Sequence, residues 1–314
     1  MSVHFASAIT KAASKQTYYT IRFFVDRDRM DDAYRSYAYF RWADDVLDSE
    51  PGVWNAADKE KASERKIFLD RQKSLLDSCY RGRPLRDAND QERMLIELVE
   101  HDREKNSGLQ SYLRNMMRVM DFDAERRGRL ISQAELDEYT RWLAVSVTEN
   151  LHYFIGHDTR LPRDEMRYQA VTGAHIAHML RDTSEDVRAG YYNIPREVLE
   201  ANHIGPQDVD SAGYRAWVES RVRLARVCFN AGKVYSRKIR NLRLRLAGFA
   251  YVARFEVLME TIEKEGFRLR PQYTERKSIG TGIRMSWLTL SSMMGLRGAG
   301  TAPQPIAPQR QGEV

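Results

Sequence analysis

The apolar residues of this chain recur at intervals of three and four positions along almost its whole length. One stretch shows the pattern with Leu109, Leu113, Met116, Met117 and Met120. This spacing places apolar side chains on one face of an α-helix, whereas a half-buried strand would alternate them every second residue. We find no convincing strand pattern, so the periodicity predicts an all-α protein.

Signals for helix ends agree with this periodicity. Ser132 and Glu135 have the spacing of a capping box, and Gly266 follows a periodic stretch as a helix stop. The sequence predicts helices near residues 14–24, 28–49, 56–80, 90–105, 109–124, 133–156, 163–188, 207–240, 243–265 and 275–296. That many helices in one chain predict a single large bundle whose ligand sites lie between facing helices.

The composition predicts a folded chain with a tail. Of 314 residues, 42% are hydrophobic, which is enough to bury a core. This composition excludes a chain that is disordered along its whole length. We expect one domain over residues 1–297 and a disordered tail over residues 298–314, which are rich in Gly, Pro and Gln. No stretch has the ~20 apolar residues of a membrane span, and the first residues lack the apolar core of a signal peptide.

Charge and cysteine content narrow the class of partner. Lys and Arg number 50 against 44 Asp and Glu, a net charge of +6 that favours anionic ligands. The basic residues match no nucleic-acid motif, so we do not expect nucleic acid to bind. Cys79 and Cys228 form no C-x-x-C pair. The chain is therefore expected in the reducing cytoplasm, with peripheral membrane contact left open.

The first candidate site is the acidic run Asp44-Asp45-Val46-Leu47-Asp48. Asp44 and Asp48 lie one helical turn apart on the same face, and tyrosine, phenylalanine and tryptophan residues precede them. Carboxylates among aromatic side chains repel one another and are poorly hydrated, both of which disfavour their charged forms. Bound cations would neutralise these charges. Arg41 precedes Asp44 by one turn and is placed to brace the run or to bind a phosphate.

A second acidic run contains Asp182, Glu185 and Asp186 at helical positions i, i+3 and i+4. One such run is most often a solvated helix face. Two runs in one α-bundle, each beside a long apolar stretch and an arginine, favour facing helices that hold Mg²⁺ around a diphosphate.

With these two acidic runs, the sequence resembles the squalene/phytoene synthases over roughly residues 14–290. The run from Asp44 to Asp48 is similar to the family's first Asp-rich motif. The run from Arg181 to Asp186, followed by Gly190 and Pro195, is similar to the second. Ser14-Lys-Gln-Thr17-Tyr18 is similar to the N-terminal segment that contacts diphosphate, and Leu136-Asp-Glu-Tyr139 is similar to the central helix with its tyrosine.

The resemblance implies an isoprenoid-synthase bundle with a central cavity. It implies Mg²⁺-dependent ionisation of one prenyl diphosphate and attack by a second, farnesyl or geranylgeranyl, to give a cyclopropylcarbinyl diphosphate and then a squalene- or phytoene-type product. It also implies roles for residues of this chain. The metal ligands would be Asp44, Asp45, Asp48, Asp182, Glu185 and Asp186; the diphosphate and chain contacts Arg41, Arg181, Thr17, Phe40, Val145 and Phe255; and the catalytic groups Tyr139, Arg41 and His178.

Several positions depart from the family pattern, including Tyr191 and Asn193, which follow the second motif where the family commonly has Arg and Tyr. His178 stands where the family has Asn, Val145 and Thr148 where it has Gly, and Phe255 where it has Tyr. A histidine can bind metal or move protons, and the added side chains are expected to narrow the chain-binding tunnel.

These departures keep two alternatives open. One is an enzyme that ionises a single prenyl diphosphate, as a cyclase or for transfer to another acceptor, and the other is a non-catalytic scaffold. No G-x-G-x-x-G fingerprint is present. NADPH use nevertheless stays open, because the family that this sequence resembles binds NADPH without that motif. Product chain length and oligomeric state are not predicted.

Overall fold

The structure, a computed structural model, describes residues 3–47, 58–83, 85–157, 164–273, 287–289 and 291. Within these residues every regular element is helical and there is no strand, which confirms the all-α prediction. The elements are α1 Val3–Ala13, α2 Lys15–Phe24, the 3₁₀ helix η1 Arg27–Arg29, α3 Met30–Leu47, α4 Asp58–Tyr80, α5 Asp90–His101, α6 Gly108–Arg126, α7 Gln133–Phe154, α8 Glu165–Ala189, α9 Arg196–Asn202, α10 Ala212–Arg237 and α11 Leu242–Lys264.

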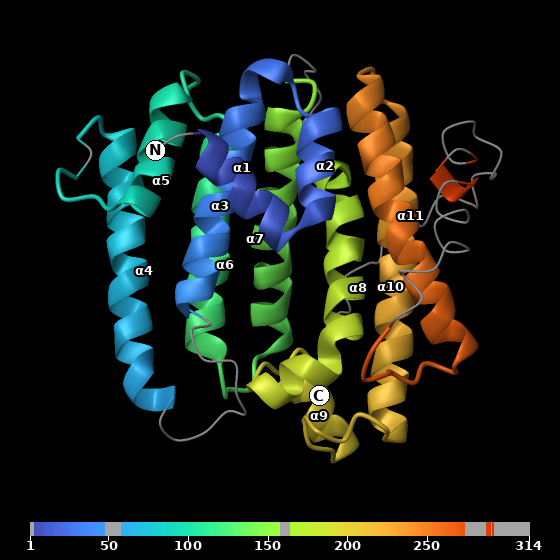
Figure 1. Cartoon of the computed structure of the whole chain (residues 1–314). Coiled ribbons are helices and arrows are strands. Elements are labelled where there is room, and N and C mark those ends of the chain that lie inside the picture. The colour runs from blue at the N-terminus through green and yellow to red at the C-terminus, as the bar shows by residue number, and fades with distance from the viewer. Residues whose placement is uncertain are drawn as a thin grey trace, which may run out of the picture.

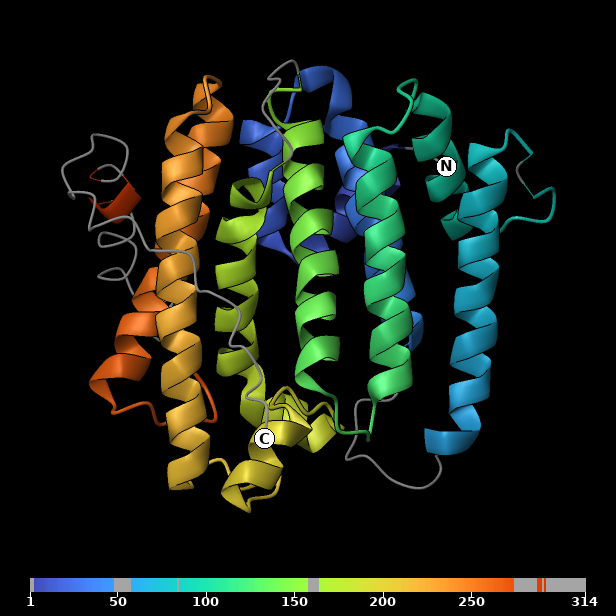
Figure 2. The ribbon, with the colours of Figure 1, turned by 180° about the vertical axis from the view of Figure 1, so that it is seen from behind.

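The long helices stand side by side with their axes roughly aligned (Figure 1). Figure 2 shows the row from behind, running from α4 through α6, α7 and α8 to α10. The short helices α1 and α2 cover α3 on the front, and α9 lies across one end of the bundle (Figure 1). Helices α3, α6, α7 and α8 thus surround the interior of the bundle, where a cavity lies.

Local sequence explains where α7 and α8 begin and end. The Ser132 side chain accepts a hydrogen bond from the Glu135 backbone N–H, and the Glu135 carboxylate accepts one from the Ser132 N–H, so the predicted capping box is present. Gly190 ends α8 with φ 86°, a left-handed conformation that glycine adopts without a Cβ clash. These caps fix where α7 begins and where α8 ends.

Two helices were not expected from the sequence. Helix α1 packs on α3, and α9 follows Pro195 for only seven residues. So short a helix shows too few periodic positions to be recognised, and packing rather than propensity stabilises it.

Parts of two predictions lie outside the described residues. The predicted tail, residues 298–314, is one of them. The other is most of the predicted last helix, of which only 287–289 and 291 are described, as helical.

Two large clusters of buried side chains make up most of the core. One gathers around α3, α5 and α6 and includes Tyr39, Leu95 and Leu113. The other lies between α8, α10 and α11 and includes Phe229 and Met259. None of the described helices is long and apolar enough to cross a membrane.

The closest helix contact predicts a sharp packing effect. A Cβ at Gly232 of α10 would lie 2.7 Å from the backbone nitrogen of Ala170 on α8. We expect Gly232→Ala to lower the free energy of unfolding by about 2 kcal/mol, because overpacking against backbone outweighs the helix propensity that alanine adds. Urea unfolding measures this change. Gly205→Ala is the control, since its Cβ would meet only Asp208 at 3.5 Å; equal stability of the two variants would contradict the prediction.

Candidate active site

A cavity of about 470 Å³ opens between α3, α6, α7 and α8. Its lining residues are Asp44, Leu47, Arg65, Met120, Asp123, Ala124, Arg126, Arg127, Tyr139, Leu143, Val147, His175, His178, Met179, Asp182, Asp186, Tyr191, Asn193 and Tyr251. Carboxylates and arginines gather at one end of this space, and Leu143, Val147 and Met179 line an apolar wall. The cavity therefore joins a charged compartment to one suited to a hydrocarbon chain.

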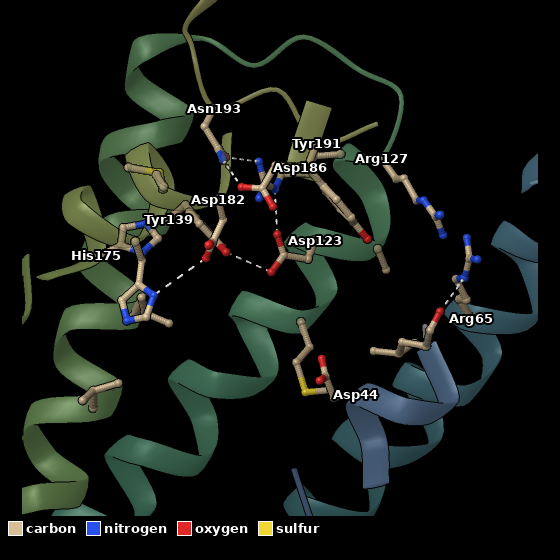
Figure 3. A pocket seen from close by; sticks show the side chains of 18 of the residues that line it. Asp44, Arg65, Asp123, Arg127, Tyr139, His175, Asp182, Asp186, Tyr191 and Asn193 are labelled. Atoms are coloured by element: carbon tan, nitrogen blue, oxygen red, sulfur yellow. Dashed lines mark hydrogen bonds and ion pairs between the residues drawn. The ribbon is translucent and has the colours of Figure 1, made fainter. Parts of the chain in front are cut away.

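The two acidic runs of the sequence meet at this cavity. Asp44 reaches it from α3, while Asp182 and Asp186 reach it from α8 (Figure 3). The side chain of Asp44 is 54% exposed, so this carboxylate lies at the mouth rather than in the interior. Asp123 of α6 also lines the cavity, close to the α8 pair (Figure 3).

The other predicted acidic ligands are placed differently. Asp45 and Glu185 are exposed and do not line the cavity, and Asp48 lies outside the described residues. In the described part of the chain, no three His, Cys, Asp or Glu side chains come together closely enough to hold a metal ion by themselves.

A partly buried hydrogen-bond network holds the α6 and α8 carboxylates in place. The guanidinium of Arg126 donates to Asp123 Oδ1 at 2.6 Å and to Asn193 Oδ1 at 2.8 Å. Asn193 Nδ2 donates to Asp186 Oδ2 at 2.7 Å, and the Tyr139 hydroxyl donates to Asp123 Oδ2 at 2.9 Å. Arg126 thus links Asp123 directly, and Asp186 through Asn193, into one rigid unit.

The two carboxyls of α8 titrate far apart. Burial, reinforced by the charge of Asp182, raises the pKa of Asp186 to about 7. Burial also disfavours the charged form of Asp182, but the nearby His178 and the hydrogen bonds from Arg181 outweigh it and lower the pKa of Asp182 to about 2. The pair therefore resists carrying two negative charges at neutral pH, a repulsion that a bound cation would relieve.

Two histidines of α8 line the cavity beside these acids. His178 Nδ1 lies 3.9 Å from Asp182 Oδ2, its ring lies 4.7 Å from the ring of Phe255, and burial lowers its pKa. His175 is 6% exposed and packs edge-to-face on Tyr139, and burial lowers its pKa to about 3. His175 Nε2 has no hydrogen-bond partner within the described structure. Both imidazoles are thus mostly neutral at pH 7.

The arginines that line the cavity are not the predicted ones. Arg41 pairs with Asp44 and Asp45, and Arg181 pairs with Asp182 at 2.5 Å, but neither lines the cavity. The lining arginines include Arg65 and Arg127, whose guanidinium groups point toward each other across the mouth (Figure 3).

Backbone carbonyls orient both of these guanidinium groups. Arg65 Nε donates to Leu47 O and Arg127 Nε to Ala189 O, each at 3.0 Å. Sequence reasoning missed Arg126 and Arg127, although Arg126 follows Asp123 by one helical turn, a spacing that could have identified it.

The remaining predicted residues lie around the cavity rather than in it. Thr17 lines a second cavity of about 120 Å³ under α2, and Phe40 packs edge-to-face on Tyr112 in the core. Val145 does not line the main cavity, whereas Leu143 and Val147 do.

The late helix α11 supplies a tyrosine that the sequence analysis did not select. Phe255 is buried behind His178, while Tyr251, one turn earlier on α11, lines the cavity. A tyrosine of this helix therefore reaches the cavity from a position other than 255.

The raised pKa of Asp186 predicts a pH-dependent stability without metal. An aspartate in the unfolded chain has a pKa near 3.9, whereas Asp186 in the folded protein has a pKa of about 7. Folding therefore favours the protonated form of Asp186, and the stability that this form contributes is lost as the pH rises through about 7. We expect Asp186→Asn to unfold at least about 2 °C higher than the parent at pH 8, and at the same temperature at pH 4. Thermal unfolding in EDTA measures this shift. The exposed Glu185→Gln serves as control, and a lower unfolding temperature for Asp186→Asn at pH 8 would contradict the expectation.

Comparisons with known proteins identify the family. The squalene/phytoene synthase family matches residues 10–279 of the chain. The fold is similar to squalene synthase HpnC from Alicyclobacillus acidocaldarius, with TM-score 0.66 and 17% identity over 85% of this chain and 95% of that one. It is also similar to a dehydrosqualene synthase in complex with ligand, with TM-score 0.68 and 16% identity over 94% and 96%.

A search of curated proteins finds no match. The family match nevertheless spans most of the chain, including both acidic runs and the helices that surround the cavity. The chain therefore belongs to the squalene/phytoene synthase family and is a prenyltransferase.

Proposed function

We propose that this protein condenses two prenyl diphosphates, farnesyl or geranylgeranyl, head to head in a Mg²⁺-dependent reaction. The product would be of the squalene or phytoene type, formed through a cyclopropylcarbinyl diphosphate. The observation that carries the proposal is the single cavity in which carboxylates of α3 and α8 face each other beside an apolar wall. The family match supports the reaction class.

The donor set fits Mg²⁺. Asp44, Asp182 and Asp186 offer hard carboxylate oxygens from two helices, and Asp45, Asp48 and Glu185 stand next to them in the sequence. Mg²⁺ usually binds proteins through one or two carboxylates, with water and substrate phosphates completing its shell, so a full protein cage is not needed. The raised pKa of Asp186 points the same way, since a cation favours its charged form.

Diphosphate binding falls to the charged end of the cavity. Bound Mg²⁺ would neutralise the phosphate oxygens and make pyrophosphate a better leaving group. Arg65 and Arg127 would bind the same oxygens from the mouth, and Arg41 and Arg181 would brace the acidic runs on either side. Guanidinium groups suit this role because they bind phosphate through paired N–H donors.

The apolar end of the cavity would hold the prenyl chains. Leu143, Val147 and Met179 exclude water from the allylic cation that forms when pyrophosphate leaves. Tyr139 and Tyr251 can stabilise this cation through their ring faces while the 2,3-double bond of the second substrate attacks it.

The groups that would hold or accept protons are Tyr139 and His178, which lie beside the carboxylates Asp123 and Asp182. The pKa of Tyr139 lies well above its usual value because burial and Asp123 disfavour its charged form, so its hydroxyl acts as a hydrogen-bond donor. Neutral His178 can accept a proton.

Mass spectrometry of the extracted products tests the proposal. Purified protein would be incubated with Mg²⁺ and farnesyl or geranylgeranyl diphosphate, with and without NADPH. A C30 or C40 product supports head-to-head condensation, and its hydrogen count with and without NADPH shows whether the reductant is used. A C15 or C20 product would support ionisation of a single substrate. No product, together with no thermal shift by Mg²⁺ and pyrophosphate, would support the scaffold alternative.

We also propose that the protein works in the cytoplasm in peripheral contact with a membrane. The reason is chemical: substrates with prenyl chains and hydrocarbon products partition into lipid.

A further inference from the structure

Three large apolar side chains protrude into solvent at one end of the bundle. Phe23 and Tyr19 of α2 are 69% and 50% exposed, and Leu242 at the start of α11 is 58% exposed. The rings of Tyr19 and Phe23 stack at 6.1 Å, one turn apart on the same face of α2. Exposed apolar side chains that gather on a surface can mark an interaction site, whereas isolated ones need no explanation.

Helix α2 and the start of α11 form one continuous surface. Arg243 Nη1 donates to the backbone carbonyls of Phe24 at 3.0 Å and Val25 at 3.3 Å, and its Nη2 pairs with Asp26. Beneath them, Ile21 and Ile239 are buried in the same core cluster. This contact places Leu242 beside the exposed end of α2, although more than 200 residues separate them in the sequence.

The charges around the three apolar side chains are mostly positive. Exposed bases on the adjoining residues are Arg22, Arg27, Arg237, Lys238 and Arg240. The acids there are Asp28, which is exposed, and Asp26, which Arg243 already pairs. Within the described structure none of the five bases forms an ion pair with a carboxylate. The exposed charges that adjoin the three apolar side chains in the sequence are therefore mostly positive.

We propose that Tyr19, Phe23 and Leu242, with these five bases, form a surface that docks on an anionic lipid bilayer. Aromatic and aliphatic side chains that insert at the headgroup level, surrounded by Lys and Arg, are the pattern of proteins that lie on membranes. Single protruding side chains set among cations suit a fluid, negatively charged surface, whereas a protein partner would need a contiguous apolar patch.

The surface also lies over the second cavity. Thr20 and Ile21 of α2 and the following Val25 line that cavity on one side, and Phe154 at the end of α7 and the following Ile155 line it on another. Helix α2 therefore separates a largely apolar space from the proposed bilayer. A role for this arrangement in passing a hydrocarbon product to lipid rests on the proposed function, whereas the docking itself does not.

Vesicle sedimentation tests the docking. The full chain would be mixed with vesicles of phosphatidylcholine alone and of phosphatidylcholine with phosphatidylglycerol. We expect binding to the anionic vesicles, weakening with added salt, and little binding to the neutral ones. Lys238→Gln/Arg240→Gln should weaken binding about fivefold per cation removed, and Phe23→Ser about tenfold or more.

Matched controls come from the other side of the bundle. Ile67 of α4 is 68% exposed, so Ile67→Ser removes an equally exposed apolar side chain. Arg93→Gln/Arg118→Gln removes two exposed charges on α5 and α6. Both variants should bind vesicles as the parent does. Equal loss of binding in surface and control variants, no binding by the parent, or equal binding to neutral and anionic vesicles would overturn the proposal.

Turnover in detergent micelles separates this inference from the proposed function. The surface variants should keep the parental rate there, because none of the changed residues lines the main cavity. Vesicle binding that depends on Phe23 in a protein without prenyl-condensing activity would leave the surface standing and refute the function. Prenyl-condensing activity without vesicle binding that depends on Phe23 would refute only the proposed docking surface.

Discussion

Asp182→Asn is expected to reduce turnover of prenyl diphosphate by at least about 1,000-fold. Asp182 keeps its charge because its pKa is lowered to about 2, so it is the α8 carboxylate best able to hold a cation at neutral pH. Losing a metal ligand removes several kcal/mol of charge stabilisation as pyrophosphate leaves, and each 1.4 kcal/mol is about tenfold in rate. Steady-state kinetics over a Mg²⁺ titration measures the loss.

The fold should survive this substitution. Asn has nearly the shape of Asp, and the Asp182 side chain is 34% exposed rather than enclosed in the core. Circular dichroism should be unchanged, while the thermal stabilisation by Mg²⁺ with pyrophosphate should disappear. Asp77→Asn is the control, since Asp77 pairs with Arg114 on the surface, away from the cavity. Full turnover by Asp182→Asn would refute the assigned role.

Arg126→Met is expected to lower the free energy of unfolding by about 3–5 kcal/mol. The guanidinium is 5% exposed and lies over the Tyr139 ring at 4.9 Å. Its removal leaves Asp123 without an ion-pair partner and the buried Asn193 Oδ1 without a donor. Urea unfolding measures the change.

Two further variants make the Arg126 prediction specific. Arg129→Gln removes an exposed pair with Glu135 and should cost no more than about 1 kcal/mol. Arg126→Met/Asp123→Leu should recover part of the loss, because it removes both members of this partly buried ion pair. A loss below about 1 kcal/mol for Arg126→Met, or no recovery in the double variant, would show that the network contributes little.

The acidic runs could be read from the sequence because each one is local. Asp182 and Asp186 share a face of any helix that contains them, whatever packs against it. The same holds for the capping box of Ser132 and Glu135, which the structure contains. Two such runs beside apolar stretches were enough to predict a shared site, and three of the six predicted acids line one cavity.

The polar network around those acids could not be read in the same way. Asp123 and Arg126 lie on α6, whereas Asn193 lies in the segment after α8. Arg126 and Asn193 are 67 residues apart in the sequence. Their contact depends on how the two helices pack, and spacing along one helix carries no information about that.

The orientation of each helix about its own axis determines which neighbours of the predicted residues line the cavity. On α7 the cavity face is Tyr139, Leu143 and Val147, so Val145 points elsewhere. On α11 the same effect brings Tyr251 to the cavity and leaves Phe255 behind His178. A turn of about 100° per residue separates adjacent positions, so only the docked orientation selects among them.

The amino-acid sequence alone determined the all-α class, most helix ranges and the two acidic runs, because these follow from periods and caps within single helices. Tertiary structure alone decided that the runs share one cavity, which arginines line it, and that Leu242 lies beside the exposed end of α2. Those features depend on contacts between residues far apart in the chain. Helix packing sets these contacts, and the pattern within any one helix is compatible with several packings.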